Sequence, residues 1–294
     1  MLDIIFNPSA GGKNGKKIFN CIEKIKARLT ERGVEFALHP ACKKGETKSL
    51  TSKLISEGAT DLVIVGGDGT LHAAINGFHS FERVNMGIIP CGTGNDFAHA
   101  LNIPKDPVKA IDLIVDGEAK FTDFMQLPGV RGLNVAGMGI DVEVLKRYER
   151  LKKKTKFGYT LCLIKTLFKF GSIKFSAEAK TQNNVINKDY NSFIAAVANG
   201  SVFGGGIPIC PKADPTDNCL DFIAVKSMNK LSLIGAFLKL KAGKILRLKQ
   251  TTHIRAESFN ILSETPCTIN VDGELYDNIL FNVEIVSNKL KIYR

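Results

Sequence analysis

Short apolar runs alternate with amphipathic stretches in the N-terminal part of the chain. The apolar runs, such as Leu62–Val65, are four or five residues long and predict buried strands. The stretches between them carry apolar residues at helical spacing, as Ile18, Ile22 and Leu29 do within Gly15–Arg32. This alternation is typical of a parallel, doubly wound α/β sheet, in which ligands bind beyond the carboxyl ends of the strands. The expected strands are Leu2–Phe6, Val34–Leu38, Leu62–Val65 and Asn85–Ile89, and the expected helices are Gly15–Arg32, Thr47–Glu57, Thr70–Asn76, Asp96–Leu101 and Pro107–Asp116.

The pattern changes after Phe121, where short β-rich stretches recur. Two basic helical stretches interrupt them, around residues 142–170 and 229–246. We therefore expect an α/β domain over residues 1–122 and an antiparallel β-sandwich domain over residues 123–294. The strands expected in the second domain are Gly132–Ala136, Ile173–Lys180, Ser192–Val197, Leu220–Val225, Thr252–Ala256, Cys267–Val271, Leu280–Val286 and Leu290–Tyr293.

The loop Gly66–Thr70 follows the third expected strand and reads Gly-Gly-Asp-Gly-Thr. Three glycines relax the steric limits on φ, so that backbone N–H groups can turn toward an anion. The helix expected from Thr70 points its positive N-terminus at the same place. Asp68 is poorly placed for holding phosphate alone, so we also expect a metal ion or a reacting hydroxyl there. A tight turn is the alternative, because Asp-Gly is a common turn pair.

A second candidate loop, Asn7–Lys17, joins the first strand to the first helix and is rich in glycine and lysine. Its backbone amides and lysines could hold phosphates. It is not a Walker A loop, because Ala10 and Lys17 stand where that motif needs Gly and Ser or Thr. An ordinary connection between strand and helix is an equally good interpretation of this loop alone.

A third loop follows the fourth expected strand and contains Gly92 and Gly94. Asn95 or Asp96 can cap the next helix. A well-capped turn explains these two polar residues fully, but it explains the two glycines less well.

Three further segments occur in the β-rich half. Asp272 and Glu274 place two carboxylates at a strand end, which suits a base or a metal ligand, although the segment alone favours a β-hairpin turn. The glycine run Gly204–Gly206 allows close approach to the backbone. The acidic segment Pro211–Asp221 could hold a divalent cation through carboxylate and carbonyl oxygens, and a simple turn explains it equally well.

The formal net charge of +11 calls for an anionic partner. No nucleic-acid motif occurs, so we expect no nucleic-acid partner. The positive charge gathers in Lys146–Lys156 and in Lys230–Lys249, where leucine and isoleucine alternate with lysine and arginine. Each segment alone is typical of a solvated helical face, and the two together suit contact with lipid head groups.

Seven scattered cysteines without a CxxC pair, and five scattered histidines, argue against a disulfide framework or a zinc site. The N-terminus lacks the pattern of a signal peptide, and no apolar run reaches the roughly 18 residues of a membrane span. We therefore expect a cytoplasmic protein that associates peripherally with the inner face of the membrane.

Taken together, the motifs resemble those of the diacylglycerol kinase catalytic-domain family, in the same order and over nearly the whole chain. The soluble bacterial diacylglycerol and lipid kinases look closest, and the sphingosine kinases look more distant. The resemblance implies two domains with ATP in the cleft between them, and Mg²⁺-dependent transfer of the γ-phosphate of ATP to a lipid hydroxyl, first of all that of diacylglycerol. The motifs that carry it are Asn7-Pro-x-x-Gly-Gly, Gly66–Thr70, Gly92-Thr-Gly-Asn-Asp-Phe-Ala98, Asn199-Gly with Gly204–Gly206, and Asp272-Gly-Glu274.

The resemblance also implies roles for individual residues. Glu274 would take the proton from the lipid hydroxyl, and Asp68 would bind Mg²⁺–ATP or share the role of base. Asp96 and Asp141 would face the substrate. The nucleotide contacts would come from Asn7, Pro8, Ser9, Ala10, Gly11, Gly12, Lys13, Thr47, Gly66, Gly67, Asp68, Gly69, Thr70 and Thr93. A structural Mg²⁺ would be held by Asp214, Asp217 and Cys219, the first and third through backbone carbonyls.

The chain departs from the family pattern at His99, where arginine is usual, and at Asn218, where glycine is usual. Two rival functions stay open. A NAD kinase also uses a Gly-Gly-Asp-Gly-Thr loop, but it looks less like the Gly92 and Asp272 motifs. A non-catalytic nucleotide- or lipid-binding module of the same fold would have no need of Glu274. An exposed strand edge in the β-rich domain could also pair two copies into a homodimer.

Overall fold

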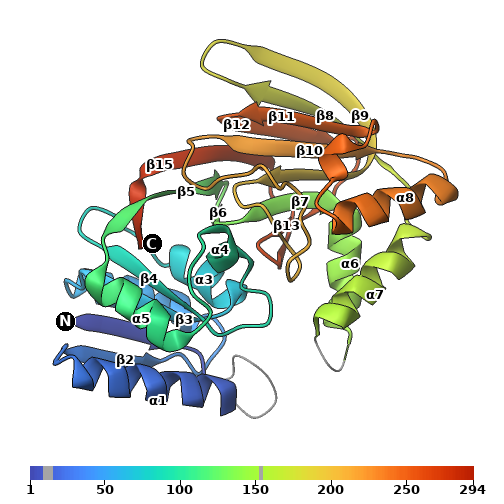
Figure 1. The fold of residues 1–294 in the computed structure, drawn as a ribbon. Helices are drawn as coiled ribbons and strands as arrows, with labels where there is room; N and C mark the ends of the chain where they lie inside the picture. Colours follow the sequence, from blue (N-terminus) through green and yellow to red (C-terminus); the bar gives the residue numbers. More distant parts are fainter. Residues whose placement is uncertain (9–15, 152–154) are drawn as a thin grey trace. The chain divides into compact units, whose positions relative to one another are not determined.

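The computed structural model describes residues 1–8, 16–151 and 155–294 of the chain, which folds into two compact units (Figure 1). The first unit comprises Met1–Asp123 together with Ser287–Arg294, and the second comprises Phe124–Val286. The sequence pattern assigns the whole of 123–294 to one domain, whereas the C-terminal segment lies in the first unit. The reason is β15 (Phe281–Tyr293), which pairs with a strand of the second unit at its start and with a strand of the first unit at its end.

The first unit is built on a parallel sheet with the strand order β2-β1-β3-β4-β15. Its central strands are almost entirely buried, and they read as continuous apolar runs because helices cover both faces. The bounds of the first four strands are β1 (Leu2–Phe6), β2 (Phe36–Pro40), β3 (Asp61–Gly66) and β4 (Asn85–Pro90).

Among the described residues, five helices connect and cover these strands. The longest, α1, buries Ile18, Ile22, Ile25 and Leu29 together with apolar residues of α5 on one face of the sheet, and α2 packs with α3. The parallel α/β architecture expected from the sequence is confirmed. The helices are α1 (Lys16–Glu31), α2 (Glu46–Ser56), α3 (Asp68–Ile75), α4 (Asp96–Ala100) and α5 (Pro107–Asp116).

Strand β2 begins at Phe36, two residues later than the pattern predicts. Gly33 has a φ of 65°, and the N–H of Val34 donates to the carbonyl of Leu29. This pair of features is a helix-ending motif, so Val34 closes α1 and does not start the strand. An apolar residue directly after a helix can serve either element, and the sequence pattern alone does not separate them.

The second unit is antiparallel and forms a β-sandwich, as expected. Its longest strand, β9, pairs with β8 through its first part and with β7 through its last part, while β10 runs along its other edge. The first part of β9 is exposed, so this part has only a weak alternation of apolar and polar residues. The sequence pattern therefore predicts the strand only from Ser192 onward. Besides β15, the described strands that begin at or after residue 119 are β5 (Ala119–Leu127), β6 (Val130–Gly132), β7 (Val135–Gly139), β8 (Ile173–Lys180), β9 (Val185–Ala198), β10 (Leu220–Lys226), β11 (Thr251–Ala256), β12 (Ser258–Ser263), β13 (Thr268–Val271) and β14 (Glu274–Asp277).

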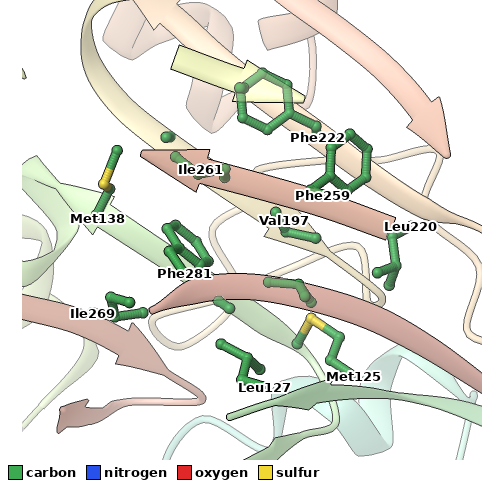
Figure 2. Close-up of a cluster of buried hydrophobic side chains, with 14 of the residues drawn as sticks. Met125, Leu127, Met138, Val197, Leu220, Phe222, Phe259, Ile261, Ile269 and Phe281 are labelled. Carbon is green, nitrogen blue, oxygen red and sulfur yellow. The ribbon is translucent and has the colours of Figure 1, made fainter. Parts of the chain in front are cut away.

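The core of the second unit lies between these strands. Figure 2 shows apolar side chains from several strands in contact, among them Met138 on β7, Val197 on β9 and Ile261 on β12. The rings of Phe222 and Phe259 stack with their centroids 5.5 Å apart. Three helices and one short 3₁₀ turn complete the unit: α6 (Ile140–Glu149), α7 (Lys156–Leu167), α8 (Lys230–Lys241) and η1 (Ile245–Arg247).

Candidate active site

The glycine loop of the first unit lies at the carboxyl end of β3. Helix α3 begins at Asp68, so Asp68, Gly69 and Thr70 form its first turn. The N–H groups of Thr70 and Leu71 both donate to the carbonyl of Gly67, at 2.9 and 3.1 Å. The helix thus starts two residues earlier than the sequence predicts, and the loop itself is reduced to Gly67.

Gly67 and Gly92 bring two loops into direct backbone contact. A Cβ atom added at Gly92 would lie 2.4 Å from the Cα of Gly67, and one added at Gly67 would lie 2.9 Å from the Cα of Gly92. Gly67 has a φ of −105°, which every residue type can adopt. The expectation that Gly67 is needed for its freedom of φ is therefore wrong. Glycine is required at this position because the loops after β3 and β4 pack too closely to leave space for a side chain.

The carboxylate of Asp68 binds the start of α4. Its Oδ2 accepts the N–H of Asn95 at 2.8 Å, and its Oδ1 accepts the N–H of Asp96 at 2.7 Å and that of Phe97 at 3.4 Å. These bonds satisfy amides that a helix leaves unpaired at its N-terminus. Asp68 therefore ties α3 to α4, which explains an acid in a loop otherwise suited to phosphate.

Lys17 is a site residue that the sequence reasoning leaves out of its nucleotide contacts. Its ammonium donates to the carbonyl of Gly92 at 3.0 Å, and the side chain of Asn95 bonds both the N–H and the carbonyl of the same glycine. A cation thus lies at the edge of the glycine loops. The sequence does contain a signal for it, since Lys17 is the last residue of the glycine- and lysine-rich segment Asn7–Lys17, whose lysines could hold phosphates.

The other predicted nucleotide residues are spread over the same unit. Asn7 and Pro8 follow β1, while Ser9, Ala10, Gly11, Gly12 and Lys13 lie outside the described residues. Thr47 is buried in the first turn of α2, and Thr93 is exposed between β4 and α4. Asp96 is buried as the first residue of α4.

In the second unit, Glu274 is the first residue of β14 and is exposed. Asp272 and Gly273 form the turn that precedes it, with φ values of 53° and 93°, while Val271 pairs with Glu274 across the hairpin. Two consecutive positive φ angles in a two-residue loop are the mark of a tight hairpin turn. The hairpin interpretation is correct, and it presents the Glu274 carboxylate to solvent.

Asp272 fixes this hairpin to the strand next to it. Its carboxylate accepts the N–H groups of Leu133, Asn134 and Val135, at 2.6, 2.8 and 3.1 Å. Three bonds to a charged acceptor hold the turn firmly. The role of Asp272 is thus to position the segment that carries Glu274.

Asp141 is fully buried at the start of α6. Burial raises the pKa of its carboxyl to about 6, although the hydrogen bond from Asn270 Nδ2, at 3.2 Å, favours the charged form. The Oδ1 of Asn270 in turn accepts the N–H of Gly273 at 2.9 Å. Asn270, which the site prediction omits, therefore links Asp141 to the hairpin of Glu274.

An apolar cavity of about 60 Å³ lies beside Asp141 in the second unit. Helices α6, α7 and α8 line it together with residues of β9 and β10, and Asp141 is the single ionisable carboxylate in the lining. A carboxylate in such surroundings is costly unless it has a partner. The lining residues are Ile140, Asp141, Tyr159, Leu163, Leu167, Phe193, Ile194, Phe203, Ile209, Val225, Leu233, Ala236, Phe237, Leu240 and Ile245.

The residues expected to hold a structural Mg²⁺ lie between β9 and β10. Asp214 Oδ1 accepts the hydroxyl of Thr216 at 2.7 Å. Asp217 accepts the N–H of Cys219 at 3.1 Å and forms an ion pair with Arg255. A cation at Asp217 would therefore have to replace a guanidinium.

Two family models match the chain. The model of the diacylglycerol kinase catalytic domain matches residues 2–127, and that of the YegS C-terminal NAD kinase beta sandwich-like domain matches residues 134–294. The two matches together extend over both units.

Individual proteins are similar over almost the full length. A diacylglycerol kinase of Staphylococcus carnosus is 27% identical, over 99% of this chain and 94% of its own. A protein named "Probable lipid kinase YegS-like" from Xanthomonas oryzae pv. oryzae is 27% identical, over 95% of this chain and 94% of its own. A crystal structure of a diacylglycerol kinase from Bacillus anthracis has the same fold, with a TM-score of 0.75 at 21% identity over 99% of this chain and 96% of that one.

Proposed function

This chain belongs to the diacylglycerol kinase catalytic-domain family, and we propose that it transfers the γ-phosphate of ATP to the hydroxyl of diacylglycerol, giving phosphatidic acid. The hydroxyl oxygen bonds to the γ-phosphorus as the bond from that phosphorus to ADP breaks. Such a reaction depends mainly on positioning and on charge neutralisation. The two units supply groups for both tasks.

We assign the nucleotide to the first unit. The two glycine loops, after β3 and after β4, pack directly against each other through Gly67 and Gly92, and Lys17 places a cation at their edge. Asn7 to Lys13, Thr47, Gly66 to Thr70 and Thr93 are the further proposed contacts. When bound, Mg²⁺ would offset the charge of the triphosphate. Asp68 acts mainly by holding the start of α4 in place.

We assign the proton acceptor to Glu274. Its carboxylate is exposed at the start of β14, on a hairpin that Asp272 and Asn270 hold by backbone hydrogen bonds. A fixed carboxylate that solvent and substrate can reach suits a general base. The carboxylate of Asp217 and the backbone carbonyls of Asp214 and Cys219 remain the proposed ligands of a structural Mg²⁺, provided that Arg255 turns away from Asp217.

The observation that carries the choice of a lipid is the apolar cavity with Asp141 at its lining. A hydrocarbon chain gains by leaving water for such a lining, and a buried carboxylate can bind a hydroxyl of the same molecule. NAD has no apolar tail to place there. The cavity is smaller than the roughly 300 Å³ of a typical ligand site, so a lipid enters only if the cavity widens.

The same two helices also carry exposed apolar side chains. Phe157 on α7 and Leu238 on α8 are 78% and 61% exposed. Lys239 and Lys241 lie in the last turn of α8. Helices that carry both exposed apolar and basic side chains favour contact with an anionic membrane. We propose that the α7–α8 surface, defined by Phe157, Leu161, Ile234, Leu238, Lys239 and Lys241, contacts the membrane from which the lipid comes.

In the part of the chain that the structure describes, no helix has the length and apolar character needed to cross a membrane.

A substrate panel tests the proposal. The purified chain is incubated with radiolabelled ATP and Mg²⁺, and with diacylglycerol, monoacylglycerol or sphingosine in mixed micelles, or with NAD. We expect label in an organic-soluble product, fastest with diacylglycerol. Label in NADP alone would establish the rival NAD kinase activity, and ATP binding without transfer to any acceptor would establish a binding module.

A further inference from the structure

A cysteine, an aspartate and a histidine meet on one face of the β10–β11 pair. In the antiparallel register, Asp221 on β10 lies opposite Arg255, and His253 on β11 lies opposite Ile223. Since alternate residues of paired strands share a face, Asp221 and His253 point to the same side. Cys210, from the segment between β9 and β10, completes the group. One ligand atom from each of the three lies within 4.8 Å of the other two.

Burial makes this cluster unlike a surface group of polar residues. Cys210 and Asp221 are 0% exposed, whereas the side chain of His253 is 22% exposed. Asp221 Oδ1 contacts the Nε2 of His253. Its Oδ2 has no hydrogen bond of standard geometry among the described residues, although the carboxylate interacts with the Cys210 thiol. The Nε of Arg255 is 3.9 Å from Oδ1, and the Nη2 of that guanidinium bonds Asp217 instead. A buried carboxylate whose second oxygen is this weakly satisfied can bind a further cationic partner.

We propose that Cys210, Asp221 and His253 bind a divalent cation of the borderline-soft class, with Zn²⁺ as the best fit. Thiolate sulfur, imidazole nitrogen and carboxylate oxygen are the ligands that zinc uses in proteins. Bonds of ~2.0–2.3 Å in a tetrahedron place ligand atoms ~3.3–3.8 Å apart. The three ligand atoms lie within 4.8 Å of one another, and the Nε2 of His253 and Oδ1 of Asp221, which are closer than this spacing, separate when the ion binds. Cys210 loses its thiol proton on binding, and water supplies the fourth ligand on the exposed side of His253.

This site differs from the Mg²⁺ site expected nearby. Mg²⁺ is a hard cation that prefers oxygen ligands, so a thiolate disfavours it. The three ligands are separated by 11 and 32 positions and form no CxxC pair, which is why the sequence alone argues against a zinc site. The ion would join β10 and β11 to the segment of Cys210, whose neighbour Ile209 lines the apolar cavity.

Cobalt substitution tests the site in the full-length protein. The chain is freed of metal with a chelator and titrated with Co²⁺. We expect one Co²⁺ per chain, a sulfur-to-cobalt charge-transfer band, tetrahedral visible bands, and displacement by one equivalent of Zn²⁺. Cys210→Ser should abolish the charge-transfer band. Cys210→Ser and His253→Gln should each weaken Zn²⁺ binding by at least ~100-fold. Loss of a residue that only supports a metal ligand lowers metal affinity by up to ~100-fold, so the loss of a direct ligand should reach or exceed this value.

Two matched variants serve as controls. Cys162→Ser removes another buried thiol of the second unit. His39→Gln removes the histidine of an Asp3–His39 pair, 2.8 Å between Nε2 and Oδ1, which belongs to the first unit. Both should bind Zn²⁺ as the wild type does. A wild-type spectrum without a charge-transfer band would overturn the proposal even if the variants fail to fold, and so would unchanged binding in folded Cys210→Ser.

Discussion

At the level of single residues, the burial of Asp141 should make the free energy of unfolding depend on pH. Its pKa is raised to about 6 in the folded chain, so the native state binds a proton that the unfolded state releases near 3.8. Proton binding by Asp141 therefore stabilises the folded state fully below pH ~4, and this stabilisation is lost as the pH rises to about 6. Ionised Asp141 then opposes folding by about 3 kcal/mol.

Asp141→Asn should remove this step. We expect the variant to be more stable than the wild type by about 3 kcal/mol at pH 8, and equally stable near pH 4. Urea unfolding at several pH values measures both, and the difference between the two proteins cancels other titrating groups. Identical pH profiles would contradict a buried, ionisable Asp141. We also expect weaker lipid binding by this variant.

A second residue, Asp272, acts through backbone amides. Asp272→Ala leaves the N–H groups of Leu133, Asn134 and Val135 without their acceptor. We expect the free energy of unfolding to fall by about 3 kcal/mol. Asp272→Asn keeps one acceptor oxygen and tolerates the φ of 53°, so its loss should be smaller. Denaturant titration ranks the two, and equal losses would contradict the role of the carboxylate.

Sequence reasoning identifies these carboxylates as candidates, but it does not find the backbone groups to which they bind. Asp68 reads as a metal or catalytic group because its partners, the amides of Asn95 and Asp96, lie 27 and 28 residues away. A hydrogen bond between distant segments leaves no periodic signal in the chain. Asn270 is overlooked for the same reason, since its contact with Asp141 spans 129 residues.

At the scale of elements, the contact between the loops after β3 and β4 depends on two glycines. Gly92→Ala would place a Cβ atom 2.4 Å from the Cα of Gly67, so the loops must separate. A displacement of about 1 Å in a positioning loop can lower activity ~100-fold, and we expect a loss of that order in kcat/KM for ATP. Gly171→Ala is the control, because nothing lies within 4 Å of its added Cβ. Equal activity of the two variants would show that the close contact is dispensable.

The elements themselves follow well from apolar patterning. Strand β1 and helix α5 have the expected bounds, because each has a clear apolar pattern and is bounded by residues that typically end a strand or a helix. β15 is instead predicted as two strands, because exposed Asn288 and Lys289 interrupt its apolar pattern. Its end buries Leu290 and Ile292 beside β4, a pairing that only the folded sheet reveals.

At the scale of the whole molecule, the α7–α8 surface should govern membrane binding. Phe157→Glu and Leu238→Glu each remove an exposed apolar group worth about 1.5–3 kcal/mol when buried, so vesicle affinity should fall ~10-fold or more per substitution. Phe19→Glu alters an exposed phenylalanine of the first unit, 64% exposed, and is the control. Co-sedimentation with anionic vesicles measures the effect.

The basic segment before α7 makes a separate contribution. Lys152, Lys153 and Lys154 lie outside the described residues, but their charge should add about 1 kcal/mol each near an anionic surface. Neutralising all three should weaken binding to anionic vesicles and leave binding to neutral vesicles unchanged. Affinity that does not depend on anionic lipid would contradict membrane contact through charge.

We propose that this chain transfers phosphate from ATP to a lipid, with Glu274 as the proton acceptor. The most direct test is the rate at which radiolabel passes from ATP to diacylglycerol, for the wild type, Glu274→Gln and Glu284→Gln, which alters an exposed glutamate on β15. We predict transfer by the wild type and by Glu284→Gln, and a rate ~100- to 10,000-fold lower for a folded Glu274→Gln that still binds ATP. A wild type that labels no lipid, or a Glu274→Gln variant as fast as the wild type, would contradict the account.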